Sequence, residues 1–361
     1  MATTAEYGLG TFAFPRGWFA VANASDVGRK PMALHYFGED LVLYRGESGR
    51  LVMLDAYCPH MGTHLASGPN SATSTAPSHM EGDNIRCPFH AWRFGPDGVC
   101  NHIPYHGGPI PPLAKLSSWT VEERYGIVFA WHDSEEQGPD FALIDFPEWH
   151  DPEWVRWAGL EYLADLHHPV EIFDNMSDVA HLGLLHGGTA LTYENAYDGH
   201  LLHQRQSSAV EAGGVFDATY STLAGYVGPG IAFGKFQEMH AREIICVTPI
   251  NDGSCRLWQT AMMKRRPGQS DAEAEAMRAQ VSKMFGEGLL RDGEVWAMKR
   301  PALKIMQLTS DGPFGQSRIW LSQFYNPRSR AAEIAARVQG THYARGWPPF
   351  TPIGAGAEAA E

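Results

Sequence analysis

Short apolar runs separated by turn residues dominate the first third of the chain. Residues 40–44 and 50–54 are β-rich, and residues 46–49 between them include glycines that can adopt the positive φ of a tight turn, so this stretch predicts a hairpin. Residues 14–21 predict a loop followed by a short strand, and residues 126–131 predict another strand. No helical period stands out before residue 150. The first third is therefore predicted to be a small all-β domain.

Beyond residue 150 the pattern alternates between helical and extended segments. Residues 170–186 predict a helix that ends at two glycines, which favour helix C-termini. Residues 271–299 carry Ala, Met, Val, Leu and Trp at helical spacing and predict a long helix. Extended runs predict strands at residues 215–223, 243–248, 255–263 and 318–325.

An acidic, turn-rich linker at residues 133–139 predicts a domain boundary close behind it. We expect a first domain at residues 10–145, a second at residues 146–345 and a tail at residues 346–361. Within the last stretch, residues 331–338 predict a helical turn or two, and residues 355–361 are predicted to be disordered. The predicted fold class is α+β, with an all-β domain ahead of a domain whose antiparallel sheet is flanked by helices.

Composition narrows the classes of protein that this chain can be. With 361 residues and 44% hydrophobic residues, it has enough apolar surface for two cores. A net charge of -13 argues against a nucleic-acid partner, because phosphates would be repelled. No apolar run approaches the roughly 18 residues of a membrane span, and the N-terminus lacks the pattern of an export signal. We therefore expect no membrane segment and a cytoplasmic location.

Two short motifs each combine one cysteine with one histidine. Cys58 and His60 form a Cys-x-His motif, and Cys87 and His90 form a Cys-x-x-His motif. Two thiolates and two imidazoles are the ligands of a two-iron, two-sulfide cluster in which the histidines hold one iron. A structural Cys2His2 zinc site is the alternative. The mixed pairing in each loop favours the cluster.

The other cysteines and the nearby histidines have no metal role that the spacing supports. The cysteine count is odd, at five, and without an export signal free thiols are more expected than a disulfide framework. Cys100, Cys246 and Cys255 are predicted to be buried, inert thiols. His64 and His79 are predicted to be loop residues.

A second candidate metal site lies on an otherwise apolar segment. His181 and His186 follow Asn175 and Asp178 there, and two neutral histidines with a separate carboxylate form a facial triad for non-heme iron, with open positions for dioxygen. A histidine pair on an apolar stretch is more often packed or capping. The independent cluster motif earlier in the chain favours the iron site.

The third iron ligand is expected on the late helix, where Asp292 and Glu294 are the candidates. On a helix Leu289, Asp292 and Trp296 share one face, so Asp292 would stand between two apolar side chains suited to a substrate pocket wall. Glu294 points elsewhere. A solvated helix charge is the alternative for Asp292.

Asp178 and Asn175 are candidates for supporting roles. Asp178 lies three residues before His181, where it can accept a hydrogen bond from a metal-bound imidazole and fix its tautomer. A helix N-cap is the other interpretation of Asp178. Asn175 either lines the iron pocket or caps the local chain.

Most of residues 10–325 resemble the Rieske oxygenases, and among them the oxygenase component of 3-ketosteroid 9α-hydroxylase. The likeness implies that Asp292 is the third iron ligand. It also implies that Asp178 bridges to His60 or His90 of a neighbouring subunit in a homotrimer. The residues that carry this likeness are 55–62, 87–93, 101–105, 111–115, 128–133 and 171–186.

The resemblance implies a monooxygenase that holds a 2Fe-2S cluster and Fe2+. It would hydroxylate a C–H bond of a bulky, hydrophobic, steroid-like substrate with O2. Electrons would come from NAD(P)H through a separate reductase or ferredoxin, because the chain lacks the glycine-rich motif of a nucleotide site. The loop at residues 65–83 is longer than is usual in the family, which puts partner docking in doubt.

Three other functions stay open. The same iron chemistry could perform oxidative N- or O-dealkylation of an aromatic compound. An electron carrier with only the cluster would not need His181, His186 and Asp292. A zinc-stabilised binding module would hold no iron.

Overall fold

The computed structural model describes residues 1–67, 79–210 and 220–343, which fall into two compact units. The small unit is Ala20–His132, and the large unit combines Met1–Phe19 with Asp133–Glu361. Residues 10–19 and 133–145 therefore group with the large unit. The domain bounds expected from the sequence, at 10–145, 146–345 and 346–361, stay predictions.

The small unit is built from short antiparallel strands, as its sequence pattern predicts. The hairpin is confirmed: β3 (Glu39–Arg45) pairs with β4 (Leu51–Asp55), and Gly49 in the turn has a φ of 87°. In the described residues the hydrogen-bonded strand orders are β1-β11-β10, β2-β3-β4-β9 and β5-β6-β7-β8. The remaining elements are β1 (Gly17–Asn23), η1 (Ala24–Asp26), β2 (Met32–Tyr36), β5 (Met80–Glu81), β6 (Asn84–Arg86), β7 (Arg93–Phe94), β8 (Cys100–His102), β9 (Ser118–Trp119), β10 (Val121–Arg124) and β11 (Ile127–His132).

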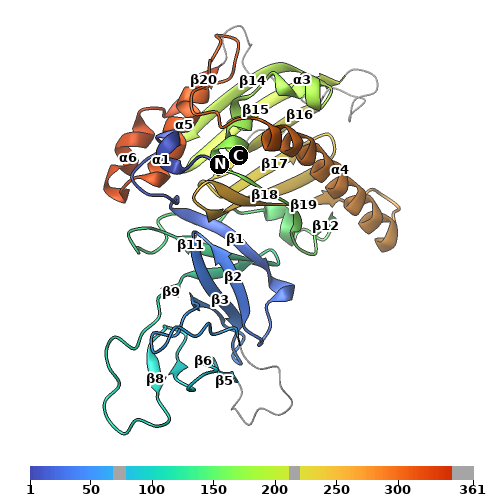
Figure 1. Ribbon diagram of the computed structural model, residues 1–361. Coiled ribbons are helices and arrows are strands. Elements are labelled where there is room, and N and C mark those ends of the chain that lie inside the picture. The colour runs from blue at the N-terminus through green and yellow to red at the C-terminus, as the bar shows by residue number, and fades with distance from the viewer. Residues whose placement is uncertain (68–78, 211–219, 344–361) are drawn as a thin grey trace. The chain divides into compact units, whose positions relative to one another are not determined.

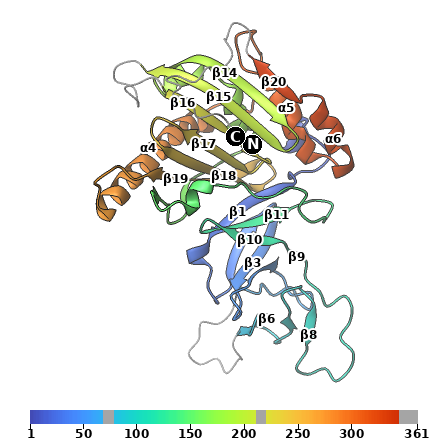
Figure 2. The same ribbon diagram turned by 180° about the vertical axis from the view of Figure 1, so that it is seen from behind.

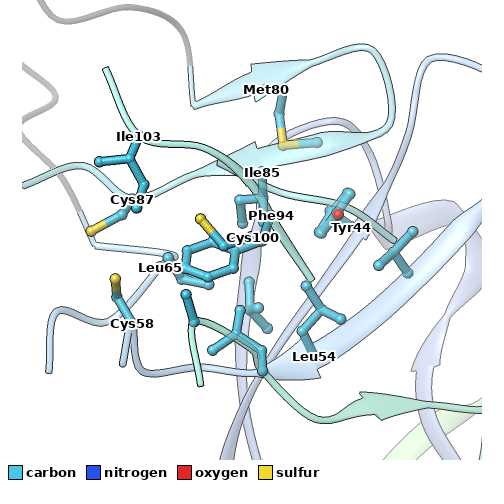
Figure 3. Close-up of a cluster of buried hydrophobic side chains, with 14 residues drawn as sticks. Tyr44, Leu54, Cys58, Leu65, Met80, Ile85, Cys87, Phe94, Cys100 and Ile103 are labelled. Carbon is cyan, nitrogen blue, oxygen red and sulfur yellow. The ribbon is translucent and has the colours of Figure 1, made fainter. Parts of the chain in front are cut away.

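A cluster of buried apolar side chains joins the strands of the small unit. Leu54, Ile85 and Phe94 are fully buried in it. Figure 3 shows Cys58 and Cys87 in the same cluster, with both sulfur atoms at one edge. The two metal-motif loops are therefore attached directly to the core of this unit.

The large unit contains a nine-stranded antiparallel sheet within the residues that the structure describes, in the order β12-β19-β18-β17-β16-β15-β14-β20, with β13 also paired to β19. The strand expected at 243–248 lies in β18, and the one expected at 255–263 lies in β19. Of the strand expected at 215–223, residues 215–219 lie outside the described residues. The strands are β12 (Trp154–Val155), β13 (Glu161–His167), β14 (Gly188–Asp198), β15 (Leu201–Val210), β16 (Tyr220–Val227), β17 (Ile231–Phe236), β18 (Ala241–Asn251), β19 (Ser254–Lys264) and β20 (Gly340–Tyr343).

The long helix α4 (Asp271–Met298) confirms the helix expected at residues 271–299. Its start is fixed by a capping box between Ser270 and Glu273, which satisfies backbone N–H groups of the first turn. Figures 1 and 2 show that α4 crosses one face of the large sheet, where Phe285 packs against Ala241 and Ala261. We call this the inner face.

The other helices are shorter than α4. The helix expected at residues 170–186 is interrupted and forms three pieces. The strand expected at residues 318–325 is wrong, because Ser317, Trp320 and Leu321 are buried with helical spacing and form part of α5. These helices are α1 (Thr4–Tyr7), η2 (Pro147–His150), α2 (Pro169–Phe173), η3 (Asp174–Ser177), α3 (His181–Leu185), α5 (Phe314–Ser322), η4 (Gln323–Tyr325) and α6 (Arg328–Ala336).

Two further sequence expectations concern residues that the structure describes only in part or not at all. The predicted disorder at 355–361 lies outside the described residues, and so does the central part of the 65–83 loop. The helical turns expected at 331–338 overlap α6. No helix in the described parts of the chain is both long and apolar enough to cross a membrane.

Candidate metal centres

The two loops that carry the Cys/His motifs have the same backbone shape. The N–H of Gly62 donates to the carbonyl of Cys58 at 2.9 Å, and the N–H of Ala91 donates to the carbonyl of Cys87 at 3.0 Å. Each closing residue is left-handed, with φ of 71° at Gly62 and 57° at Ala91. Alanine is uncommon in this conformation. Both turns therefore begin at a cysteine and close by the same backbone hydrogen bond, with the histidine at the third position of one turn and the fourth of the other.

Four potential ligand side chains converge between these loops. The rings of His60 and His90 lie 4.7 Å apart, centroid to centroid. Cys58 and Cys87 are buried; the hydrogen bond between their thiols lowers the pKa of Cys87 and raises that of Cys58.

His90 also supplies a test of whether this site suits a metal cluster. Its Nδ1 atom is buried and has no hydrogen-bond partner in the part of the chain that the structure describes. A buried polar atom without a partner is unfavourable, and binding to iron would satisfy this one. The donor set and the unpartnered nitrogen therefore fit a 2Fe-2S cluster.

Aromatic side chains surround the histidine end of this site. Trp92 stacks on His60 at 4.6 Å, and its indole N–H donates to the hydroxyl of Tyr105 at 2.7 Å. Met61, Phe89 and Tyr105 are 65%, 58% and 62% exposed. We call these three exposed residues the cluster rim.

The large unit brings together the three residues expected to hold iron. His181 begins α3, His186 directly follows it, and Asp292 comes from α4. Their ligand atoms all lie within 4.8 Å of one another, and His186 Nε2 is 3.1 Å from Asp292 Oδ1. Asp292 is 3% exposed, so it is not the solvated helix charge considered as the alternative.

Asn175 connects two of these residues. Its side-chain N–H donates to Asp292 Oδ2 at 3.1 Å and approaches His181 Nε2 at 3.4 Å. The amide therefore lies beside the ligand atoms, as expected for a pocket residue.

Asp178 contacts His181 differently from the expectation. The backbone carbonyl of Asp178 accepts a hydrogen bond from His181 Nδ1 at 2.5 Å, whereas the nearest carboxylate oxygen is 3.9 Å from that nitrogen. The carboxylate instead accepts from the backbone N–H of His181 at 3.3 Å. The carbonyl therefore fixes a tautomer with Nδ1 protonated and Nε2 free for a metal.

Of the two residues expected to form a pocket wall beside Asp292, Trp296 lines a cavity at the candidate ligands and Leu289 is not among its lining residues. Trp296 is buried in a cluster with Ile172 and Leu257, and Leu289 is half-buried. Glu294 is exposed.

A cavity of about 270 Å3 opens beside the candidate ligands. Polar groups and apolar groups share its wall, so it can admit both water and an apolar group. Its lining includes Asn175, Asp178, His181, Asp292, Leu185, Val295, Ile305 and Phe314.

Glu171, Lys299 and Ala302 also line the cavity and belong to a polar network that the sequence pattern does not indicate. The hydroxyl of Tyr7 donates to the carboxylate of Glu171, which also pairs with Lys299 and accepts from the N–H of Ala302 at 2.8 Å. The N-terminal segment is thereby joined to α2 and to the chain that follows α4. Nothing in the local pattern around Tyr7 identifies it, because its partner is 164 residues away.

A second ion pair stabilises the same region. Arg318 contacts Asp174 through Nε at 3.0 Å and Nη2 at 2.5 Å, and Nη2 also donates to the carbonyl of Ala302 at 2.7 Å. Bidentate geometry of this kind is among the stronger ion-pair arrangements. It positions η3, which precedes the candidate iron ligands.

The sequence matches two protein-family models. Residues 17–119 match the Rieske [2Fe-2S] domain, and residues 130–325 match the 3-ketosteroid 9α-hydroxylase C-terminal domain. The second match alone covers more than half of the chain.

Similar proteins are known along most of the chain's length. The probable oxygenase component of 3-ketosteroid-9-alpha-monooxygenase from Rhodococcus rhodochrous is 34% identical over 340 residues, which cover 89% of this chain and 82% of that protein. The oxygenase component of 3-ketosteroid-9-alpha-monooxygenase from Mycolicibacterium smegmatis is 32% identical over 329 residues, covering 86% of this chain and 82% of that protein.

A solved structure shares the fold. The crystal structure of apo dicamba monooxygenase aligns with a TM-score of 0.64 at 18% sequence identity. The alignment covers 93% of this chain and 100% of the dicamba monooxygenase chain.

Proposed function

The chain belongs to the 3-ketosteroid 9α-hydroxylase family of Rieske non-heme iron monooxygenases, and from this premise we propose that it hydroxylates a C–H bond of a bulky, steroid-like ketone. The proposed substrate class is supported by sequence identity of 32–34% to the ketosteroid oxygenase components across 86–89% of the chain. As an oxygenase component, the chain works with a separate electron donor, for which we propose an NAD(P)H-dependent reductase, with or without a ferredoxin.

The cluster is assigned to four residues of the small unit. Cys58 and Cys87 would hold one iron, and His60 and His90 would hold the other. Such a cluster supplies single electrons at a potential raised by its histidine ligands. The two hydrogen-bonded turns hold the four side chains, and the stack of Trp92 on His60 limits rotation of that ring.

The mononuclear iron is assigned to His181, His186 and Asp292. When bound there, the iron supplies the chemistry that activates O2 at its open positions. The chain's own contribution is to position the ligands. The carbonyl of Asp178 holds the proton on His181 Nδ1, and Asn175 donates to Asp292 Oδ2, so that Oδ1 faces His186.

The wall of α4 is assigned to the substrate. Leu289 and Trp296 lie on the same side of this helix as Asp292, so they would contact an apolar skeleton and keep water from the reacting carbon. The buried position of Trp296 supports this role.

The electron path is proposed to run between subunits of a homotrimer. Exposed apolar residues lie on the elements around the cavity: Leu184 is 89% exposed, Met298 is 89% exposed and Met306 is 90% exposed. We call these three residues the mouth patch. The cluster rim of one chain and the mouth patch of another are both apolar, so they suit a head-to-tail contact between subunits. Such contacts form a closed ring when the rotation from one subunit to the next brings the last back to the first.

In that arrangement His60 or His90 of one subunit would face Asp178 of the next. Asp178 lines the cavity and its carbonyl contacts His181, so it stands between the neighbour's cluster and the iron ligand. Size measurement by analytical ultracentrifugation tests the assembly: a trimer supports the path, and a monomer that turns over at full rate contradicts it.

Turnover with a defined steroid tests the reaction. The purified, iron-replete protein is supplied with 4-androstene-3,17-dione, NADH, a surrogate Rieske reductase and labelled O2, and the product mass is measured. Gain of one labelled oxygen atom is expected. No product from a protein with a reducible cluster and bound iron would contradict the steroid assignment and favour dealkylation of a smaller aromatic compound.

A further inference from the structure

Several buried side-chain atoms of the large sheet have no hydrogen-bond partner among the residues that the structure describes. They include Oε1 of Glu243 and both polar atoms of the Gln259 amide. Glu243 is 7% exposed and Gln259 is 0% exposed. Because an unpartnered buried polar group is costly, such a pair needs either a structural compensation or a ligand.

Unlike the buried acids Glu171 and Asp174, Glu243 forms no ion pair with a residue that the structure describes. Glu171 pairs with Lys299, and Asp174 pairs with Arg318. For Glu243, burial raises the carboxyl pKa to about 8, and only the neighbouring Gln259 amide acts against that rise. At neutral pH the carboxyl is therefore mostly protonated and can donate a hydrogen bond.

Both side chains lie on the inner face, under α4. Glu243 is paired in register with Ala261, which packs against α4, and residues directly opposite share one face of a sheet. Gln259 is two residues from Ala261 on the same strand and has the same orientation. A Cβ atom at Gly286 of α4 would come within 3.2 Å of Gln259 Oε1.

The helix that covers Glu243 and Gln259 also carries the candidate iron ligand Asp292. Gly286 and Asp292 are six residues apart on α4, which at a rise of 1.5 Å per residue corresponds to about 9 Å along the helix. A fused-ring skeleton can span such a distance.

A row of paired residues also connects Glu243 with the iron segment across the sheet. Gln204 is paired with Ala224, Ala224 with Gly234, and Gly234 with Glu243. Gln204 donates to the carbonyl of Met176 at 2.8 Å, directly before the candidate ligands. The two middle residues of this row, Ala224 and Gly234, have the smallest side chains, so the inner face has little side-chain bulk there.

We propose that Glu243, supported by Gln259, anchors the substrate by a hydrogen bond to a ketone or hydroxyl oxygen at the end remote from the hydroxylated carbon. The assignment rests on the proposed function and adds the residue that recognises the polar end of an otherwise apolar substrate. The ligand chemistry is a rigid alicyclic skeleton with a ketone or hydroxyl oxygen at the end remote from the reacting carbon.

Binding to variants of Glu243 tests this assignment by calorimetry with 4-androstene-3,17-dione. Glu243→Leu leaves the ligand oxygen without a donor and is expected to weaken binding about tenfold. Glu243→Gln keeps an N–H donor and should stay within about threefold of the wild type. Replacing an unpartnered buried acid by leucine should not prevent folding.

Glu194→Gln is the matched control. Glu194 is also 7% exposed, but it pairs with Arg205 at 3.3 Å and its register partner lies on the opposite face from Glu243. This change should leave steroid binding unaltered. A tenfold loss in Glu194→Gln equal to that in Glu243→Leu would contradict a specific anchor.

Two monoketones then locate the oxygen that Glu243 recognises. The loss in Glu243→Leu should persist for either 4-androsten-3-one or androstan-17-one and disappear for the other. Infrared difference spectra add a readout that a structural role would not move: the C=O stretch of the protonated carboxyl should be absent in Glu243→Gln and should shift in the wild type when the diketone binds.

The outcomes separate this inference from the proposed function. If the wild type binds and hydroxylates the diketone while Glu243→Leu binds it equally well and no band shifts, the anchor is wrong and the function stands. If the wild type binds no steroid, the steroid function is contradicted and the anchor with it.

Discussion

The two candidate metal centres are constructed in opposite ways. The cluster site of the small unit comes from two short loops in one local stretch, and each loop closes on itself by a backbone hydrogen bond. The iron site of the large unit joins His186 to Asp292, which is 106 residues away. A local motif can therefore identify the first site, whereas the second depends on the whole unit packing correctly.

The two sites also differ in the protein contacts that their proposed ligand side chains make. The small-unit site leaves His90 Nδ1 without a partner among the described residues and has an exposed rim. The large-unit site is held by Asn175 and the Asp178 carbonyl, and behind these by the network around Glu171. We expect substitutions in the large unit to act over longer distances than substitutions in the small unit.

The largest expected effect is at the cluster. Cys58→Ser removes a proposed ligand and should abolish the cluster's visible absorption and all reductase-driven turnover. Iron bound by the large unit should remain, since its ligands are untouched. Absorption and metal analysis of the purified variant check both points. Retention of the full cluster spectrum would contradict the ligand assignment, and Cys100→Ser is the control expected to keep it.

The next effect is a pH dependence specific to the large unit. Burial lowers the pKa of His168 to about 4, and Nδ1 accepts from the N–H of Val170 at 3.1 Å while Nε2 lies 2.9 Å from the Thr4 hydroxyl. The folded-state pKa is below the unfolded value of about 6.5. The stabilisation is complete above about pH 6.5 and is lost as the pH falls to about 4, by up to about 3 kcal/mol.

Urea unfolding of the wild type and His168→Asn at several pH values measures this loss. Asparagine keeps an acceptor at the helix N-cap but does not titrate, so its stability should change less over this window. Equal pH dependence in both proteins would show that another group is responsible.

Asn175→Ala tests whether neighbouring side chains support the proposed ligands of the iron site. Loss of the amide that contacts Asp292 and His181 is expected to weaken iron binding by about 10- to 100-fold, as is typical for groups that orient metal ligands. The cluster spectrum should be unchanged. Iron titration with a competing chelator measures the affinity, and an unaltered affinity would mean that Asn175 only lines the pocket.

The smallest effect is expected from Tyr7→Phe. It removes one hydrogen bond to Glu171, whose carboxylate keeps Lys299 and the N–H of Ala302 as partners, so the cost should be about 1 kcal/mol. Hydrogen exchange should increase in α2 and in the segment after α4, while small-unit peptides stay protected as before. Faster exchange only in the small unit would contradict the network.

Local patterns predict the parts of this protein that depend on nearby residues. The hairpin of β3 and β4, the helix α4 and the two Cys/His loops all have signals within a few residues. Asp292 was proposed because helical spacing places it between Leu289 and Trp296 and the family resemblance selects it over Glu294, and the structure brings it close to His181 and His186.

Tertiary packing decides what these patterns missed. The stretch that contains Trp320 looks extended in sequence, but its apolar residues fit a helix face once Trp320 and Leu321 are buried together. His181 Nδ1 has its shortest contact with the Asp178 carbonyl, whereas the pattern pointed to the Asp178 carboxylate, which lies 3.9 Å from that nitrogen. Tyr7 acquires its contact from Glu171, which is 164 residues away, and no local pattern records such a partner.

Metal content is the most direct test of two separately built centres in one chain. Iron, acid-labile sulfide and zinc are measured in the wild type and in Asp292→Ala, together with the electron paramagnetic resonance signal of the reduced cluster. We predict that the variant loses the mononuclear iron and keeps the cluster's iron, sulfide and signal. Zinc in place of iron, or loss of the cluster signal in Asp292→Ala, would contradict the account.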